Sequence, residues 1–224
     1  MSRARIHDLY AHPMDASAIE AESFRRIDLE ATDQSLNSEE WQVARRLVHT
    51  TADFGLVDDL VFAHGAIAAG CEALRARAPI YVDSNMIAAG LSLARLTGCN
   101  PDYVREDVLV HVADIEVARE AMASRLPRAV HAVRRARERL NGAIVCFGNS
   151  PVGLLELNRM IQEEGTRPAL VVAMPVGFVH VIESKEELMQ LDVPQIVIRG
   201  RRGGSPLAVA TVHALAMLAA KEIS

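Results

Sequence analysis

His49 stands at the end of the stretch WQVARRLVH, and histidine is the side chain that most readily gives or takes a proton near neutral pH. At 100° per residue along a helix, the apolar residues of this stretch gather on one arc. His49 falls on the opposite arc, with Arg45 and Arg46. We therefore expect an exposed imidazole at the end of a helix. Such a histidine can be a proton donor, but from the residues alone an ordinary helix-end histidine is the more frequent case.

The segment RGRRGGS at residues 199–205 combines arginines with glycines directly before a predicted helix. Glycines let backbone N–H groups approach a ligand, and the positive end of a helix dipole favours negative charge. Arg201 and Arg202 are therefore candidates for binding carboxylates. In isolation such a charged turn is more often merely solvated. Its place after a predicted strand favours ligand binding instead.

Ser150 also follows a predicted strand, in the segment GNSPVG, but the usual signatures of α/β enzymes are missing around it. Val152 replaces the second glycine of a G-x-S-x-G nucleophile elbow. Leu154 stands where a phosphate-binding loop needs lysine, and the central glycine of a dinucleotide fingerprint is absent. A serine hydrolase and a nucleotide-binding enzyme are therefore both disfavoured. Ser150 followed by proline is typical of a helix N-cap.

The elements that must position these residues begin with five short runs rich in Val and Ile. They lie at residues 79–83, 107–112, 142–147, 168–174 and 194–200. Each is bounded by Gly, Pro or Asp, as expected for strands covered on both faces. With the helical patterns between them, they predict a doubly wound α/β fold with a mainly parallel, five-stranded sheet flanked by helices.

The N-terminal third shows helical patterns instead, near residues 16–30, 38–50 and 65–77. No repeat or low-complexity linker divides the chain, so residues 1–224 are predicted to form a single domain with a helical N-terminal segment. In open α/β sheets, ligands bind beyond the carboxyl ends of the strands. That rule selects four loops. They are residues 83–85, 148–150, 174–177 and 199–205.

Charge, hydropathy and cysteine content disfavour several other classes of protein. The formal net charge of −5 argues against a nucleic-acid partner, and no segment is apolar and long enough to enter a membrane. Arg3 and Arg5 are not followed by an apolar run, so no secretory signal is expected and the cytoplasm is the expected compartment. The three cysteines are widely spaced, and no metal site is predicted.

Over nearly its whole length the chain resembles the precorrin-8X and cobalt-precorrin-8 methylmutases. Six segments carry the resemblance in the same order: the stretch around Ser23 and Phe24, RRLVHTTADF, APIYVDSNMIAAGLSLARL, GAIVCFGNSPVGLLEL, MPVGFVHVIESKEEL and IVIRGRRGGS. MPVGFV followed by ESK is the most specific of them. The resemblance implies a homodimeric α/β enzyme without a metal or nucleotide cofactor, whose tetrapyrrole site lies near the subunit interface.

The same resemblance implies the reaction, in which a methyl group moves from C-11 to C-12 of the corrin precursor to give hydrogenobyrinate or cobyrinate. His49 would be the general acid. Ser23, Ser92 and Arg128 match positions at the family's site, although the surroundings of Arg128 differ and Arg125 is a reserve candidate. The loops that face the macrocycle contribute the remaining expected contacts, namely Asn149, Ser150, Pro175, Val176, Gly177, Arg201 and Arg202.

Two other functions remain open at this stage. A noncatalytic corrinoid carrier would use the same pocket and hand its ligand onward. An unrelated α/β hydrolase or transferase is disfavoured by the missing motifs. No residue indicates whether the natural substrate contains cobalt, or whether the product is released or channelled.

Overall fold

A single mixed sheet of six strands forms the centre of the computed structural model, which describes residues 3–31 and 35–221. The strand order is β1-β6-β5-β4-β2-β3. The strands are β1 (Leu60–Ala63), β2 (Ile80–Val82), β3 (Val108–Leu109), β4 (Ile144–Phe147), β5 (Leu170–Ala173) and β6 (Gln195–Ile198). The five predicted strands are all present and pair in parallel. The predicted mainly parallel architecture is thus confirmed.

The sheet has one strand more than the sequence predicted. β1 pairs antiparallel with β6, with Leu60 opposite Ile198 and Ala63 opposite Gln195. Its four residues, LVFA, follow a 3-10 helix, η1 (Phe54–Asp59), and are too short to produce a periodic signal of their own. Because β6 offers a free edge, pairing with it gives this segment its conformation.

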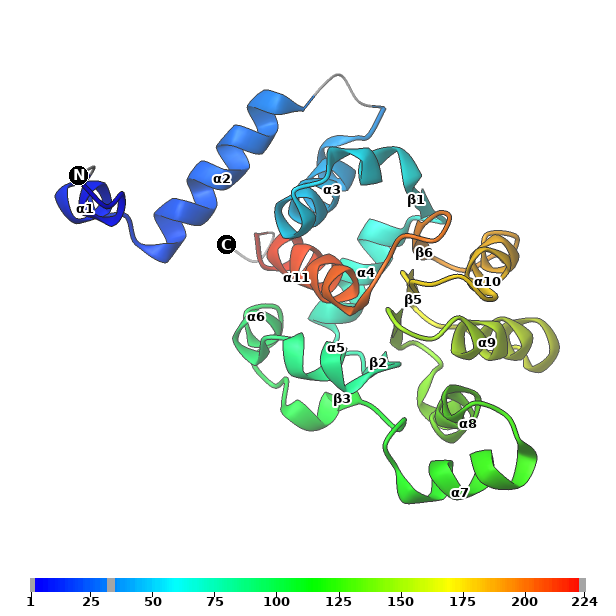
Figure 1. The fold of residues 1–224 in the computed structure, drawn as a ribbon. Helices are drawn as coiled ribbons and strands as arrows, with labels where there is room; N and C mark the ends of the chain where they lie inside the picture. The colour runs from blue at the N-terminus through cyan, green and yellow to red at the C-terminus, as the bar shows by residue number, and fades with distance from the viewer. Residues whose placement is uncertain (1–2, 32–34, 222–224) are drawn as a thin grey trace.

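Helices cover both faces of the sheet, as Figure 1 shows. One face carries α3 (Ser38–Thr51), α4 (Ala66–Arg75), α5 (Asn85–Gly90), α6 (Leu93–Thr97) and α11 (Ser205–Lys221). The other carries α8 (Arg128–Arg135), α9 (Pro151–Glu164) and α10 (Val181–Leu188), with α7 (Ile115–Ser124) packed outside α8. Two short 3-10 helices, η2 (Arg105–Asp107) and η3 (Arg137–Arg139), complete the connections.

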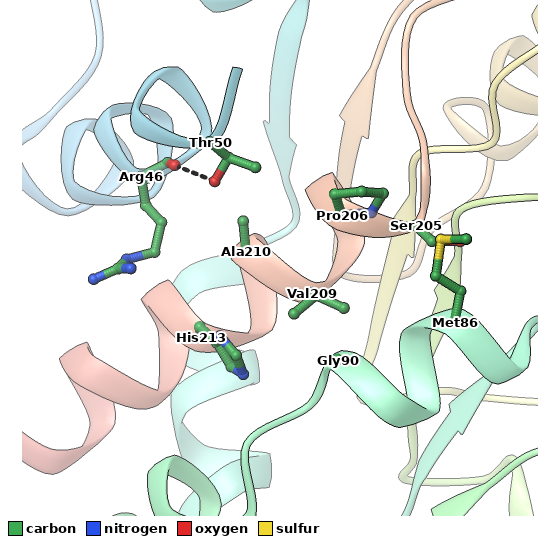
Figure 2. A pocket seen from close by; sticks show the side chains of 9 residues that line it. All are labelled: Arg46, Thr50, Met86, Gly90, Ser205, Pro206, Val209, Ala210 and His213. Atoms are coloured by element: carbon green, nitrogen blue, oxygen red, sulfur yellow. Dashed lines mark hydrogen bonds between the residues drawn. The ribbon is translucent and has the colours of Figure 1, made fainter. Parts of the chain in front are cut away.

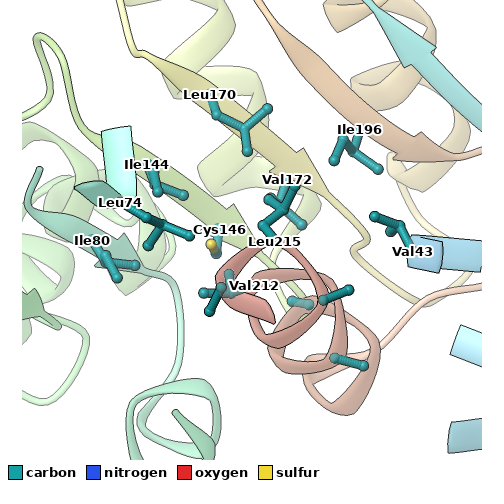
Figure 3. Packing of buried hydrophobic residues seen from close by; sticks show 14 of the residues in the cluster. Val43, Leu74, Ile80, Ile144, Cys146, Leu170, Val172, Ile196, Val212 and Leu215 are labelled. Carbon is teal, nitrogen blue, oxygen red and sulfur yellow. The ribbon is translucent and has the colours of Figure 1, made fainter. Parts of the chain in front are cut away.

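Alternate residues of each central strand enter two separate cores. In β4, Ile144 and Cys146 pack with the α11 layer, whereas Val145 and Phe147 pack with the α9 layer. Figure 3 shows the first core, where Val212 of α11 approaches the strands. Since every residue of β4, β5 and β6 is buried, the strands read as continuous apolar runs rather than as alternating patterns.

Two N-terminal helices extend from this body. α1 (Ile6–Ala11) and α2 (Ala16–Glu30) contain no buried residue, and α2 packs mainly against α3 (Figure 1). The predicted helices at 16–30, 38–50 and 65–77 correspond to α2, α3 and α4. Within the described ranges, no helix is at once long enough and apolar enough to cross a membrane.

Candidate functional site

Four loops meet at the carboxyl edge of the parallel strands, as predicted. The Ser84 hydroxyl, after β2, lies 3.0 Å from the Ser205 hydroxyl, after β6. The backbone N–H of Gly204 donates to the carbonyl of Met174, after β5, over 2.7 Å. A Cβ on Gly148, after β4, would come within 2.7 Å of the Ser205 Cα. The loops therefore form one packed surface.

The loop after β6 lies directly on the loop after β5. Gly203 has a φ of +156°, and a Cβ there would stand 2.2 Å from the Met174 carbonyl oxygen. Only glycine can occupy this position without moving one of the two backbones. The Gly177 N–H also donates to the Arg201 carbonyl over 3.3 Å. The loops MPVG (174–177) and RGRRGGS (199–205) consequently pack directly on one another and are held together by backbone hydrogen bonds.

Asp83 occupies the anion-binding position in the loop after β4. Its buried carboxylate accepts backbone N–H groups from Gly148 (3.2 Å), Asn149 (2.8 Å) and Ser150 (2.6 Å). Burial raises the pKa of Asp83, and the three N–H donors act against that rise. These three backbone donors are therefore not available to a ligand's carboxylates, because a protein carboxylate already accepts from them.

The side chains of this loop separate into two kinds. Ser150 is buried, and its hydroxyl caps α9 by accepting from the Gly153 N–H over 3.3 Å, as its position before proline predicted. Asn149 is exposed. Of the two residues named from the sequence, the Asn149 side chain is the one that a ligand can reach.

Arg201 and Arg202 point to different partners although they are neighbours. The Arg202 guanidinium lies 3.4 Å from Asp53 and 3.7 Å from Asp59, on the segment that follows α3. The Arg201 guanidinium lies over the ring of Phe178, 5.4 Å from its centroid. The two had been expected to act alike. Arg202 is instead engaged with protein carboxylates, which leaves Arg201 as the cation open to a ligand.

Phe178 belongs to an exposed apolar stretch in which the sequence predicted ligand contacts only as far as Gly177. Val176, Phe178 and Val179 are 48%, 84% and 68% exposed. Pro175, next to them, is buried. The stretch follows β5 at the carboxyl edge, so an apolar ligand surface could be covered there. The apolar composition of MPVGFV is the signal in the sequence from which these residues could have been found.

His49 is exposed in the last turn of α3, as predicted. Its ring lies against Phe24 of α2, with 5.1 Å between centroids and a tilt of 52°. The guanidinium groups of Arg45 and Arg46 also lie over the Phe24 ring, at 4.6 and 5.0 Å from its centroid. Phe24 thus ties the histidine to α2.

The placement of Arg46 on the polar arc with His49 was wrong. Arg46 is 7% exposed and reaches across to Glu20 of α2, 3.1 Å away, and to the Met217 sulfur of α11, 3.0 Å away. A helical projection assumes one buried face, but α3 packs between α2 and α11 and so buries two. Arg46 lies in the second interface, where Glu20 balances its charge.

A pocket of about 330 Å³ opens between α3, α5 and α11, beside the turn that carries His49 (Figure 2). Its lining residues are Arg46, Thr50, Met86, Gly90, Ser205, Pro206, Val209, Ala210 and His213. Thr50 directly follows His49, and its hydroxyl donates to the Arg46 carbonyl over 2.8 Å. The pocket joins the loop edge, through Ser205, to the end of α3.

His213 was not selected from the sequence, and it connects Ser92 to this pocket. The Ser92 backbone N–H donates to His213 Nε2 over 3.0 Å. Burial of the ring is the main cause that lowers the pKa of His213 to about 4, and the positive charges of Arg95 and Arg46 lower it further. The ring is therefore neutral near pH 7, with its proton on Nδ1. Ser23 lies on α2 beside Phe24, and its hydroxyl donates to the Ile19 carbonyl over 2.9 Å.

Arg128 lies apart from these residues. It begins α8, on the face of the sheet opposite α3 (Figure 1). The neighbouring Ala129 packs near Gly153 at the start of α9, so Arg128 is still at the carboxyl edge. Arg125 ends α7 with a φ of +60° and is likewise exposed. Within one chain the residues predicted to form the site thus lie in three places. His49 and Ser23 lie where α3 meets α2, with Ser92 across the neighbouring pocket. Arg128 lies by itself at the start of α8, and the other predicted residues lie in the loops after β4, β5 and β6.

Among the described residues, no three His, Cys, Asp or Glu side chains gather as a metal ion would require. Neutral imidazole, packed aromatic rings and exposed arginines surround the pocket and the edge loops. The fold is that of an α/β protein in which a pocket, exposed apolar side chains and exposed arginines lie near the carboxyl edge of the sheet, where proteins of this class bind their ligands.

Comparison with known proteins gives the family. The model of the precorrin-8X methylmutase family matches residues 18–218. The chain is 39% identical to a cobalt-precorrin-8 methylmutase of Leptospira interrogans, covering 91% of this chain and 94% of that one. It is also 39% identical to a precorrin-8X methylmutase of Pseudomonas aeruginosa, covering 90% and 95%. A solved structure of precorrin-8X methylmutase from Thermus thermophilus superposes with a TM-score of 0.84 at 46% identity, covering 92% and 98%. The chain belongs to the precorrin-8X methylmutase family, a family of isomerases.

Proposed function

We propose that this protein isomerises precorrin-8X or cobalt-precorrin-8 in cobalamin biosynthesis. The methyl group would move from C-11 to C-12, giving hydrogenobyrinate or cobyrinate. The family match supports the substrate class. The observation that carries the reaction is the exposed imidazole of His49, which is held against Phe24 and adjoins a pocket on the same helix.

His49 would act as the general acid. A proton delivered to the conjugated macrocycle makes it a better electron acceptor while the methyl group leaves C-11 and bonds to C-12. The proton is lost again when the product forms, so the mass of the molecule is unchanged. A positioned general acid contributes roughly 10² to 10⁴ in rate. No nucleophile is needed, which agrees with Ser150 serving as a helix cap.

The remaining residues would hold the substrate. Arg201 and Arg128 are exposed cations suited to its carboxylates. Ser23 and Ser92 would offer hydroxyl groups, and Asn149 an amide. The loop from Pro175 to Gly177 would cover an apolar part of the ring. Arg202 would act indirectly, because it already faces Asp53 and Asp59.

We further propose a homodimer. The N-terminal helices and the connection between them expose apolar side chains that a second copy would cover, between 38% and 68% exposed. They are Ile6, Leu9, Tyr10, Met14 and Ile19. Light scattering of a dilute sample tests this. A fully active monomer at nanomolar concentration would contradict it.

Incubation with metal-free and cobalt-containing substrate tests the function. We expect the absorption spectrum to change while the mass stays constant, with one of the two substrates converted faster. A noncatalytic carrier, the alternative, would bind the substrate and leave its ring unrearranged. Relatives with either substrate in their name are equally similar to this chain, so only this experiment separates the two substrates. We also propose that the protein is located in the cytoplasm, where we expect its biosynthetic pathway to operate.

A further inference from the structure

Lys185 is the lysine of the ESK sequence, the part of the most specific motif to which no role has so far been given. Lys185 lies in α10 and is only 1% exposed to solvent. The ammonium group donates to two backbone carbonyls of the turn after β6, Gly200 at 2.9 Å and Arg202 at 2.7 Å. Lys185 therefore hydrogen-bonds to the turn on both sides of Arg201.

The turn needs such a contact because its own backbone is irregular. Gly200 has a φ of +67° and Gly203 one of +156°, so no regular ladder of hydrogen bonds spans the segment. Two of its carbonyls point inward, and a buried carbonyl without a donor is costly. Lys185 supplies both donors from one atom. Its position thus fixes the direction in which the intervening Arg201 leaves the backbone.

Within the described parts of the chain, no carboxylate forms an ion pair with the Lys185 ammonium group. Its hydrogen bonds go to carbonyl oxygens, and the acidic group that acts on it from a distance is Asp59 of η1. Glu186 of α10 and Arg199 line the same small pocket, of about 250 Å³. Arg202 faces Asp59 as well. A buried cation next to an arginine turn raises the local positive potential, which favours an anion above the turn.

We propose that Lys185 is a positioning residue for carboxylate recognition, ordering the turn Gly200–Arg202 so that Arg201 meets the substrate and adding positive charge beneath it. The inference rests on the proposed function. It names a residue that acts through Arg201 rather than one that touches the reacting atoms.

Proton linkage gives the role a signature that a purely structural residue would lack. Burial lowers the pKa of Lys185 to about 8, against the opposing pull of Asp59. A polycarboxylate bound above the turn stabilises the ammonium form, so the bound state keeps its proton to higher pH. Affinity is therefore full below pH 8 and falls as pH rises through 8, because the free protein then binds fewer protons than the complex.

The test uses the full-length protein, with cobyrinic acid as a stable polycarboxylate probe. Lys185→Met removes the donors and the charge at similar length, and Lys185→Gln keeps a donor without the charge. We expect Kd to rise about tenfold for Lys185→Met and about threefold for Lys185→Gln. Between pH 7 and 9 the wild-type Kd should rise about fivefold, and the Lys185→Met Kd should stay level.

A double-mutant cycle with Arg201→Ala shows whether Lys185 acts through Arg201. In the Arg201→Ala background, Lys185→Met should weaken binding by no more than about fivefold, because the group that Lys185 positions is gone and only the effect of its charge on the ligand remains to be lost. Thermal unfolding checks the fold. Lys185→Met leaves the Gly200 and Arg202 carbonyls without their donor, so Tm should fall by about 4 to 8 °C, and the titrations are run at a temperature well below the Tm of the variant.

The outcomes separate this inference from the proposed function. If the wild-type protein neither binds cobyrinic acid nor converts precorrin-8X or cobalt-precorrin-8, the proposed function fails. If it does both while Lys185→Met binds as tightly at every pH, only the role of Lys185 is overturned. Additive losses in the cycle would overturn it too, since they would make Lys185 independent of Arg201.

Discussion

The imidazole of His49 rests on the ring of Phe24, 5.1 Å between centroids, and the two residues come from different helices. Phe24 lies in α2, which contributes no buried residue to the body of the protein. The contact therefore links the proposed general acid to the N-terminal helices. Any change that moves α2 should also move His49.

His49→Ala should stop the methyl shift without unfolding the protein. The side chain is exposed, so its removal costs little stability, about 0.5 kcal/mol or less. Loss of a general acid should slow the single-turnover reaction by roughly 10² to 10⁴. Absorption spectra with saturating substrate measure this, and His12→Ala, at another exposed histidine, serves as a control. A rate within threefold of the wild type would remove His49 from the mechanism.

Phe24→Leu should lower the rate by less, about tenfold, because the acid remains but its support is lost. Phe24→Tyr keeps a ring over His49, Arg45 and Arg46 and should stay within about threefold of the wild type. The same single-turnover assay applies. Equal rates for the two variants would show that the ring does not orient the histidine.

Arg201→Ala and Arg202→Ala form a matched pair. Arg201 is open to a ligand, so its loss should weaken corrinoid binding about tenfold at low salt and less at high salt. Arg202 faces Asp53 and Asp59, so its loss should change affinity by no more than about twofold. Titration at two ionic strengths reports both. The opposite ranking would show that Arg202 leaves its carboxylates to bind the ligand.

Asp83→Asn should destabilise the fold strongly. The carboxylate accepts three backbone N–H groups inside the protein, and an amide has one acceptor oxygen and an NH₂ group that would face donors. A loss of roughly 3 kcal/mol in the free energy of unfolding is expected. Urea denaturation measures it, with the exposed Asp58→Asn as the control. Similar urea midpoints for both variants would show that the hydrogen bonds from the three backbone N–H groups to Asp83 do not stabilise the fold.

His213 should make the protein less stable in mild acid. Its pKa is about 4 in the folded protein and near the ordinary value of 6.5 when unfolded. Below pH 6.5 the unfolded chain binds the extra proton, so the free energy of unfolding falls as pH drops from 6.5 to 4. After solvent screening, the loss due to this residue is roughly 1 to 2 kcal/mol.

Denaturation curves at pH 7 and 4.5 for wild type and His213→Gln test this prediction. Glutamine can still accept the Ser92 N–H but does not titrate. The variant should lose less stability than the wild type over this interval. Parallel curves would mean that His213 does not carry the effect.

The sequence alone determined the five parallel strands, the helices between them and the edge at which the loops meet. These features depend on local patterns: apolar runs bounded by Gly and Pro give strands covered on both faces, and Ser150 before proline gives a helix cap. The exposure of His49 followed from the helical period for the same reason. Strand β1 carried no such pattern and appeared only through pairing with β6.

The tertiary structure decided which polar groups remain open to a ligand. Asp83 lies 65 positions before Gly148, so nothing local could show that it takes the N–H groups of that loop. Lys185 reaches Arg202 across 17 positions, and Arg46 reaches Met217 across 171. Hydrogen bonds and ion pairs depend on distances in space, which residue patterns along the chain do not encode. The same pattern that identified the loops therefore could not tell Arg201 from Arg202.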